Sequence, residues 1–341
     1  MSQRYAVLIS GDLAENGYPE FFFDVVLMRN MLINNGFPPG NIFVLYGDGS
    51  DYNNANYPAT KYRPSPAITD LSATITNVQD IFSDLANGTN GRPRLTNEDM
   101  LFVWTFDHGS QIPTSPGSTT LISTLGLRDG DMRADDFTTA IDAISYAYRV
   151  ICMQQCRAGG FISHLANDRT VIITAAEANR NAHPTDDVAE RETIAGKVYP
   201  HGEFNFHLLG ALNGQDLLGN TANADSNSNG FTTMQEVFNY ITSHESDSAT
   251  PQYDDGSRDI GDWLHLIYVA NTNTKEIHTS HCYWVTRMAN SNKSPCESLE
   301  DLMTLIRDYG YNGCYYCLPR YDRDTHSKQT VLNNLQDDLT G

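Results

Sequence analysis

The sequence predicts an α/β fold with a mainly parallel sheet sandwiched by helices, plus a small α+β module at the C-terminus. Short, continuous apolar runs alternate with segments of helical character through most of the chain. Because strands buried on both faces read as continuous apolar runs, this alternation indicates a sheet covered by helices on both sides. Four of the six cysteines fall within residues 282–317, after a turn-forming stretch at residues 271–274. We therefore expect two domains, residues 1–270 and 271–341, which the length of 341 residues allows.

The apolar runs that predict core strands cover residues 5–10, 42–46, 100–106, 148–153 and 170–174. Helices are predicted over residues 20–35, 68–85, 134–145, 233–244 and 298–309, the second of them from apolar residues spaced three and four apart. The first helix is expected to end at Gly36, because glycine often terminates helices in the left-handed conformation. A further strand is expected over residues 263–269, and the Asn-, Asp- and Pro-rich residues 48–64 predict a surface loop.

The charge balance excludes some classes of protein. Acidic residues outnumber basic ones 42 to 22, which gives a formal net charge of −20. Such a charge repels nucleic acid and anionic membranes, so a nucleic-acid partner is not expected. No apolar run approaches the roughly 18 residues of a membrane span, and the chain starts directly with a predicted strand, so we expect a cytoplasmic protein. Thiols stay reduced in the cytoplasm, so we expect the cysteines to serve catalysis or metal binding rather than disulfides.

Three polar residues follow predicted strands directly: His108, Cys156 and Glu177. In parallel sheets the functional site lies beyond the carboxyl ends of the strands. A cysteine nucleophile acts as a thiolate, and a nearby histidine can lower its pKa or protonate the leaving amine. Gly109 lets a backbone N–H approach a substrate oxygen closely, so the N–H groups of Gly109 and Cys156 could form an oxyanion hole. Cys152 lies within its strand and is predicted to be packing.

Residues 102–110, FVWTFDHGS, resemble the His-Gly motif of legumain-type and caspase-like cysteine peptidases, and residues 150–160, VICMQQCRAGG, are similar to their nucleophile motif. The resemblance covers roughly residues 4–270 and implies a caspase-hemoglobinase fold. It also implies cysteine endopeptidase activity through a thioester acyl-enzyme, with Cys156 as nucleophile and His108 as general acid/base. Two alternatives stay open: a peptide ligase or transpeptidase with the same dyad, and a catalytically silent protein-binding scaffold.

The resemblance places the pocket for the P1 residue of a protein or peptide substrate at Glu20, Gln154 and Glu177. The legumain pattern has an arginine near Glu20 and a glutamate at the position of Gln154. Acidic groups in a partly desolvated pocket would favour Arg or Lys at P1 over Asn or Asp. The alternative is that Glu20 only favours a helix N-terminus. Residues 181–197 are a hypothetical loop for self-cleavage.

Residues 225–236 have the spacing of an EF-hand calcium loop. The expected oxygen ligands are Asp225, Asn227, Asn229, the Phe231 carbonyl and Glu236. Thr232 replaces the usual aliphatic residue and no clear helix enters the loop, so a loop that merely caps the helix at residues 233–244 is an equal alternative. Similar loops in bacterial relatives of this peptidase group favour structural calcium.

The C-terminal module carries a His-x-x-x-Cys pair and a Cys-x-x-Cys pair. These pairs supply four tetrahedral zinc ligands: His278, Cys282, Cys314 and Cys317. Structural zinc would stabilise a module that is too small to form a large apolar core. The stretch resembles the Ada-like metal-binding fold, which has cysteine at the position of His278. His281 is a rival ligand, Cys296 is predicted to be packing, and the few basic residues favour docking of a protein partner.

Overall fold

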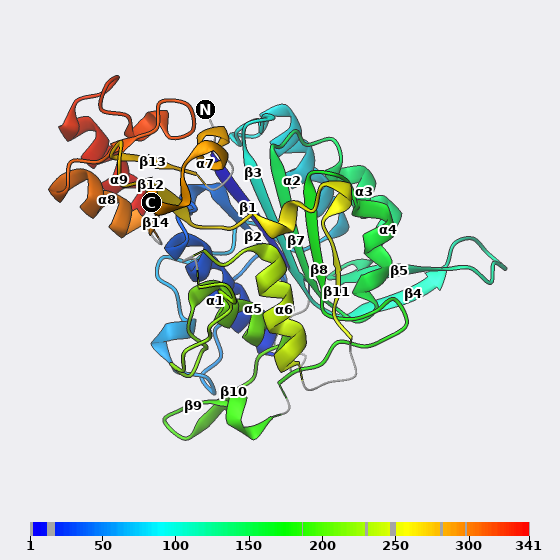
Figure 1. The fold of residues 1–341 in the computed structure, drawn as a ribbon. Helices are drawn as coiled ribbons and strands as arrows, with labels where there is room; N and C mark the ends of the chain where they lie inside the picture. Colours follow the sequence, from blue (N-terminus) through cyan, green and yellow to red (C-terminus); the bar gives the residue numbers. More distant parts are fainter. Residues whose placement is uncertain are drawn as a thin grey trace.

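The computed structural model describes residues 3–11, 18–185, 187–228, 231–245, 250–279, 282–296 and 299–340. Its central sheet has the strand order β11-β8-β7-β3-β1-β2 (Figure 1). These strands are β1 (Arg4–Ser10), β2 (Ile42–Tyr46), β3 (Met100–Phe106), β7 (Tyr148–Gln154), β8 (Thr170–Thr174) and β11 (Gln252–Asp254). Only β11 is antiparallel to its neighbour, and the other pairs are parallel. The predicted fold class is therefore confirmed.

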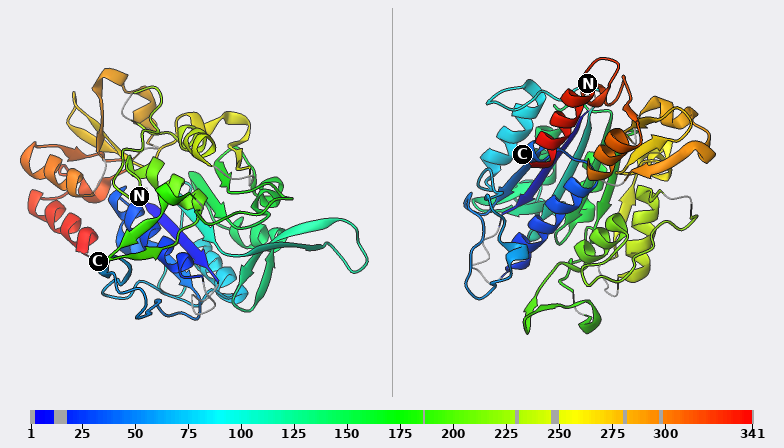
Figure 2. Two further views of the ribbon diagram at one scale, coloured as in Figure 1. Left: turned by 90° about the horizontal axis from the view of Figure 1, so that it is seen from below. Right: turned by 90° about the vertical axis from the view of Figure 1, so that its left-hand side faces the viewer.

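Helices cover both faces of this sheet (Figures 1 and 2). On one face lie α1 (Glu20–Asn34), α5 (Glu203–Asn213) and α6 (Met234–His244), and on the other α2 (Ile75–Asn87), α3 (Ala134–Ile141) and α4 (Ile162–Leu165). Alternate residues of β1 point into the two apolar layers: Leu8 packs under the first face and Ile9 under the second. Both strand faces are thus buried, which explains the unbroken apolar runs. None of the helices in the described residues is long and apolar enough to span a membrane.

Two predicted helices differ from the structure. The helix expected over residues 68–85 starts only at residue 75, where the Thr74 hydroxyl caps it by accepting the Asn77 N–H. Residues 68–71 instead run beside β2, where the Leu71 N–H donates to the Val44 carbonyl. Backbone pairing with the sheet edge overrides the helical spacing of side chains there. The helix expected over residues 134–145 ends at residue 141.

The edge strand β11 was not predicted from the sequence, nor were two small antiparallel sheets outside the central sheet. Directly after His108, the strands β4 (Gly109–Pro113), β5 (Leu121–Leu127) and β6 (Gly130–Arg133) form a three-stranded sheet. Figure 1 shows the β4–β5 hairpin projecting from the body of the protein. A second hairpin joins β9 (Glu192–Ile194) to β10 (Lys197–Tyr199). Both hairpins follow strand ends that carry candidate site residues.

The C-terminal part has its own sheet and apolar core. The strands β12 (Tyr268–Asn271), β13 (Glu276–His278), β14 (Lys293–Cys296) and β15 (Asn312–Gly313) have the order β14-β12-β13-β15, beside α7 (Tyr283–Arg287), α8 (Leu299–Asp308) and α9 (Lys328–Thr340). The strand expected over residues 263–269 begins only at residue 268, so β12 spans the expected boundary. Arg4 joins the two parts: its guanidinium donates to the Leu266 carbonyl and stacks over the Tyr268 ring, 4.0 Å from the ring centroid. The division into two domains remains a prediction.

Candidate active site

His108 and Cys156 lie at the same edge of the central sheet. The paired residues Phe106 and Gln154 end the neighbouring parallel strands β3 and β7, and each candidate follows its strand end by two residues. Both side chains line one pocket of about 130 Å³. The Asp107 carboxylate accepts the His108 backbone N–H at 2.6 Å, which fixes the chain as it leaves the strand. The register of the sheet therefore brings the two predicted residues to one site.

Two aromatic rings hold the His108 imidazole. The rings of Tyr18 and Phe21 pack edge-on against it, with centroid distances of 4.7 and 5.4 Å. Phe21 is buried and also packs edge-on against Phe106 at the end of β3. The sequence analysis missed both rings, although aromatic residues around the start of the first helix were visible beside Glu20. Their contacts limit rotation of an imidazole that is exposed to solvent.

A sharp turn presents Cys156. The next residue, Arg157, has a φ of 65°, and its N–H donates to the Arg180 carbonyl at 2.8 Å. The half-buried thiol of Cys156 donates to the Ala182 carbonyl at 3.7 Å. By contrast, burial raises the pKa of the Cys152 thiol and keeps it protonated. Its place in the apolar layer agrees with the prediction that Cys152 is packing.

Gly109 backs directly onto the backbone of Cys156. A Cβ at Gly109 would lie 2.0 Å from the Cys156 carbonyl oxygen, so any side chain would push the His-Gly segment away from Cys156. Glycine is therefore required by close backbone approach rather than by an unusual φ. This contact joins the two motifs physically. The expected oxyanion hole of Gly109 and Cys156 N–H groups stays a prediction.

The three residues expected to select P1 have different surroundings. Glu20, the first residue of α1, and Gln154 both line the pocket, whereas Glu177 is not among its lining residues. Gln154 is 1% exposed, and its amide oxygen accepts the Asn205 N–H at 2.7 Å. Its amide group occupies the space that a Cβ at Gly202 would need. Gln154 thus fastens β7 to the start of α5.

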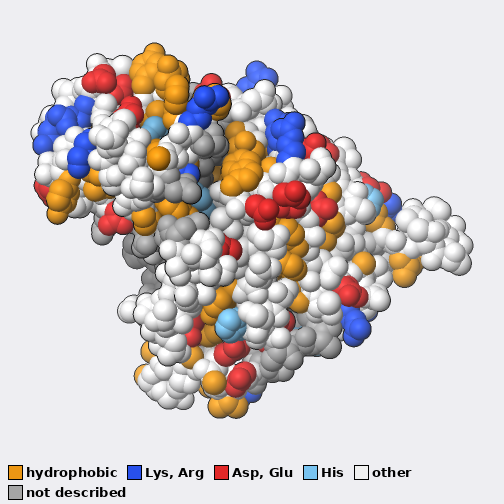
Figure 3. All heavy atoms as spheres, in the orientation of Figure 1, with side chains coloured by type: hydrophobic (Ala, Val, Ile, Leu, Met, Phe, Trp, Pro, Cys, Tyr) orange, Lys and Arg blue, Asp and Glu red, His pale blue; other side chains and the backbone are white. Residues whose placement is uncertain are grey.

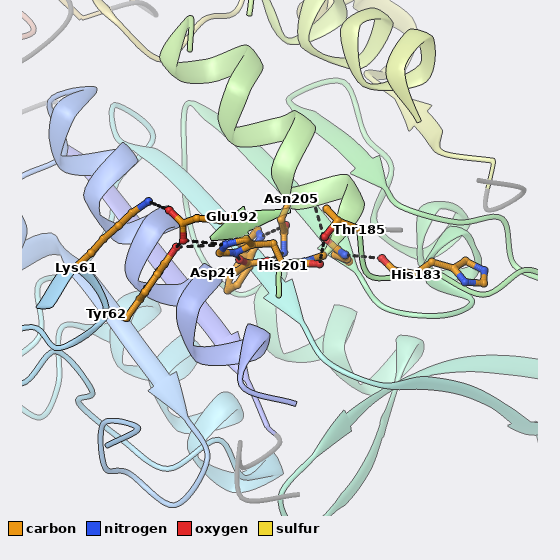
Figure 4. Close-up of polar contacts among 11 residues, drawn as sticks. Asp24, Lys61, Tyr62, His183, Thr185, Glu192, His201 and Asn205 are labelled. Carbon is orange, nitrogen blue, oxygen red and sulfur yellow. Dashed lines mark hydrogen bonds and ion pairs between the residues drawn. The ribbon is translucent and has the colours of Figure 1, made fainter. Parts of the chain in front are cut away.

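A buried ionic network lies behind this contact (Figure 4). The His201 Nδ1–H donates to one Asp24 oxygen at 2.6 Å, and the other Asp24 oxygen accepts from the Gly202 N–H and the Asn205 amide. Burial alone would lower the pKa of His201, but Asp24 and Glu192 raise it to about 9. The imidazole is therefore protonated at neutral pH.

Glu192 closes the network on the other side. Burial works to raise its pKa, but hydrogen bonds from His201, Lys61 and Tyr62 lower the pKa to about 2. The network joins α1, α5, β9 and residues 61–62, and it reaches Gln154 through Asn205 (Figure 4). Its members are far apart in sequence and no motif marks them, so the sequence analysis could not find it.

The four predicted ligands of the C-terminal module come together. His278, Cys282, Cys314 and Cys317 are all buried, and their ligand atoms lie within 4.8 Å of one another. The His278 Nδ1 is 3.5 Å from the Cys282 Sγ. Three sulfurs and one imidazole nitrogen are the donors of a tetrahedral structural zinc site, so the cluster fits this metal. The rival His281 lies outside the described residues, and Cys296 is buried in the apolar core of the module.

The expected calcium loop adopts the form of a helix cap. The Glu236 carboxylate accepts hydrogen bonds from Ser226, from the Asn227 amide and from the Thr233 N–H. Thr233 in turn accepts the Glu236 N–H, which completes a capping box at the start of α6. Asn229 lies outside the described residues, and Phe231 is buried beside the His265 ring. Calcium binding by Asp225 and these residues stays a prediction.

A parallel sheet with histidine and cysteine past neighbouring strand ends is the arrangement of a caspase-like cysteine peptidase. The model of the Peptidase C13 family matches residues 4–260, and the chain belongs to this family of cysteine peptidases. Among solved structures, protein GSU0716 from Geobacter sulfurreducens is similar with a TM-score of 0.46 and 12% identity, over 74% of this chain and 92% of that one. No curated protein matches the sequence.

Proposed function

We propose that the protein is an endopeptidase that cleaves peptide bonds through a Cys156 thioester, with His108 as general acid/base. The observation that carries the proposal is that both side chains line one pocket at the ends of adjacent strands. Gly109, packed against the Cys156 carbonyl, keeps the two motifs in contact. The resulting proximity is what nucleophilic catalysis by a thiol requires.

In the proposed reaction, the Cys156 thiolate forms a bond to the scissile carbonyl carbon. The electron pair of that carbonyl moves to its oxygen, which the N–H groups of Gly109 and Cys156 would stabilise. Collapse of this intermediate breaks the C–N bond, and His108 gives a proton to the leaving amine. Water then attacks the thioester with His108 as base, which releases the acid and restores the thiol. A peptide amine in place of water would give ligation.

For specificity we propose Arg or Lys at P1. Glu20 supports this preference because the residue is 9% exposed and lines the pocket. A basic side chain entering there would gain an ionic partner in a partly desolvated place. Gln154 contributes shape rather than charge, because its amide is held by Asn205 and His183. Cleavage after Asn or Asp would retain the peptidase and reject this role of Glu20.

We further propose that the cluster of His278, Cys282, Cys314 and Cys317 holds structural zinc. The metal would bridge the end of β13 and the start of α7 to the turn after β15. Exposed aromatic side chains of this module are Tyr283, Trp284, Tyr309, Tyr315 and Tyr316. Hydrophobic side chains gather on the module in Figure 3, which supports docking of a protein partner.

The decisive experiment is cleavage of a fluorogenic peptide library varied at P1. We expect turnover after Arg or Lys in the wild type and no turnover in Cys156→Ala or His108→Ala. Cys152→Ala and His164→Ala are the matched controls, because Cys152 is buried in its strand and His164 is exposed on α4. Thermal unfolding checks that each variant is folded. Normal cleavage by Cys156→Ala refutes the proposal, and a folded wild type inactive on every peptide favours the scaffold.

A further inference from the structure

We propose that Glu190, Glu203 and His207 form a second metal site, distinct from the cysteine cluster, that binds Zn²⁺. Their ligand atoms lie within 4.8 Å of one another. Glu203 and His207 are four residues apart on α5 and therefore share one face of the helix. Glu190 ends the short helix η5 (Val188–Glu190) and approaches from the side, with its Oε1 3.5 Å from the His207 Nε2.

The strongest observation is the state of the histidine. His207 is 3% exposed, yet its Nε2 has no hydrogen-bond partner within the described part of the chain. Leaving a buried polar atom unsatisfied costs about 1–3 kcal/mol. A buried ring nitrogen that makes no hydrogen bond to the described residues and lies beside two carboxyl groups is available to ligate a metal.

The donor set selects zinc over calcium. One imidazole and two carboxylates are typical zinc ligands, and sites with three protein ligands leave one position for water. Calcium takes oxygen ligands only, six to eight of them as a rule. The 3.5 Å between the His207 Nε2 and Glu190 Oε1 is close to the separation of two ligands about 2 Å from one tetrahedral ion.

A metal at this site would hold the segment 184–203 against α5. The Glu203 N–H donates to the His183 carbonyl at 3.1 Å, and Pro184 pairs with Gly202. His183 and Pro184 also line the pocket that holds Cys156. The segment 184–203 is thus fastened to α5 at one end, and a metal held by Glu190 would fasten it at a second point.

Metal binding can be measured without any activity, so the test uses full-length Cys156→Ala protein, which cannot cleave itself. We expect two equivalents of Co²⁺ or Zn²⁺ per chain. One cobalt equivalent should show sulfur-to-cobalt charge-transfer absorption, and the other should lack it. Cys314→Ser should lose only the first equivalent, whereas Glu190→Gln and His207→Gln should lose only the second. Glu98→Gln and His164→Gln, exposed and remote in sequence, should keep both.

A second readout is hydrogen exchange within the segment 184–203. In the Cys314→Ser background, metal should slow hydrogen exchange across residues 187–199, and Glu190→Gln should abolish that protection. Glu190→Gln is the variant less prone to misfold, because the Glu190 side chain is only partly buried whereas the His207 side chain is buried. A single equivalent that always carries sulfur absorption overturns the proposal. So does a second equivalent that survives in both Glu190→Gln and His207→Gln.

Discussion

At the residue scale, backbone contact between Gly109 and Cys156 holds the two motifs of the proposed catalytic pair together. We predict that Gly109→Ala lowers kcat/KM by about 100-fold or more, because the new Cβ would displace the oxyanion donors. Gly40→Ala is the matched control, since a Cβ at Gly40 meets no atom within 4 Å. Peptide kinetics compares the two. Equal activity in both variants would show that this contact does not matter for turnover.

A second residue-scale prediction concerns His201, whose folded-state pKa is raised to about 9 from 6.5. A raised pKa means that the folded state binds the proton more tightly, so its stabilisation is complete below pH 6.5 and is lost as pH rises to 9. The loss amounts to at most about 3 kcal/mol. Urea unfolding at pH 6 and pH 9.5 should show this fall in the wild type. His201→Gln should be less stable at pH 6 and should show a smaller fall; an unchanged fall contradicts the assignment.

At the element scale, the loop before α6 is held by its capping box. Thr233→Ala removes the hydroxyl that accepts the Glu236 N–H, so we expect a loss of about 1 kcal/mol in the free energy of unfolding. Thr242→Ala, on the exposed side of the same helix, is the control.

The same loop carries the calcium prediction, which is that Ca²⁺ raises the Tm of the wild type and not that of Asp225→Asn. Equal Tm values with and without Ca²⁺ would leave the cap as the whole role of the loop.

Another prediction at the element scale concerns self-cleavage in the segment after β8. The Cys156 thiol faces the Ala182 carbonyl at 3.7 Å, so residues 181–197 start beside Cys156. If this segment is a processing loop, intact-mass analysis should find a cut in the wild type and none in Cys156→Ala. Uncut masses for both proteins, under conditions where peptides are cleaved, would reject self-cleavage.

At the scale of the whole molecule, we expect the C-terminal module to depend on metal bound by its histidine and three cysteines. His278→Ala and Cys314→Ala should each lose one zinc and the cooperative unfolding of the module, because its apolar core is small. Cys296→Ala is the matched control, since this cysteine is buried in the module but is not part of the cluster. Metal analysis and calorimetry measure both effects. Retention of zinc by His278→Ala would point to another ligand.

Much of this architecture followed from local patterns. The five strands of the parallel sheet were predicted to within one residue, because burial on both faces leaves unbroken apolar runs. His108 and Cys156 line one pocket and the four predicted ligands of the module form one cluster, and these residues were predicted because the proposed chemistry needs particular residue types at short spacings. The β4–β5–β6 sheet was missed, since its strands are partly exposed and carry mixed residues.

By itself, the sequence determined the fold class, and it predicted His108, Cys156 and the His/Cys pairs of the C-terminal module, all of which rest on neighbouring residues. Only the tertiary structure decided which distant groups meet. It joined Asp24 to His201 and Gln154 to Asn205. Such contacts satisfy buried polar groups by geometry, and partners of this kind leave no periodic trace along the chain.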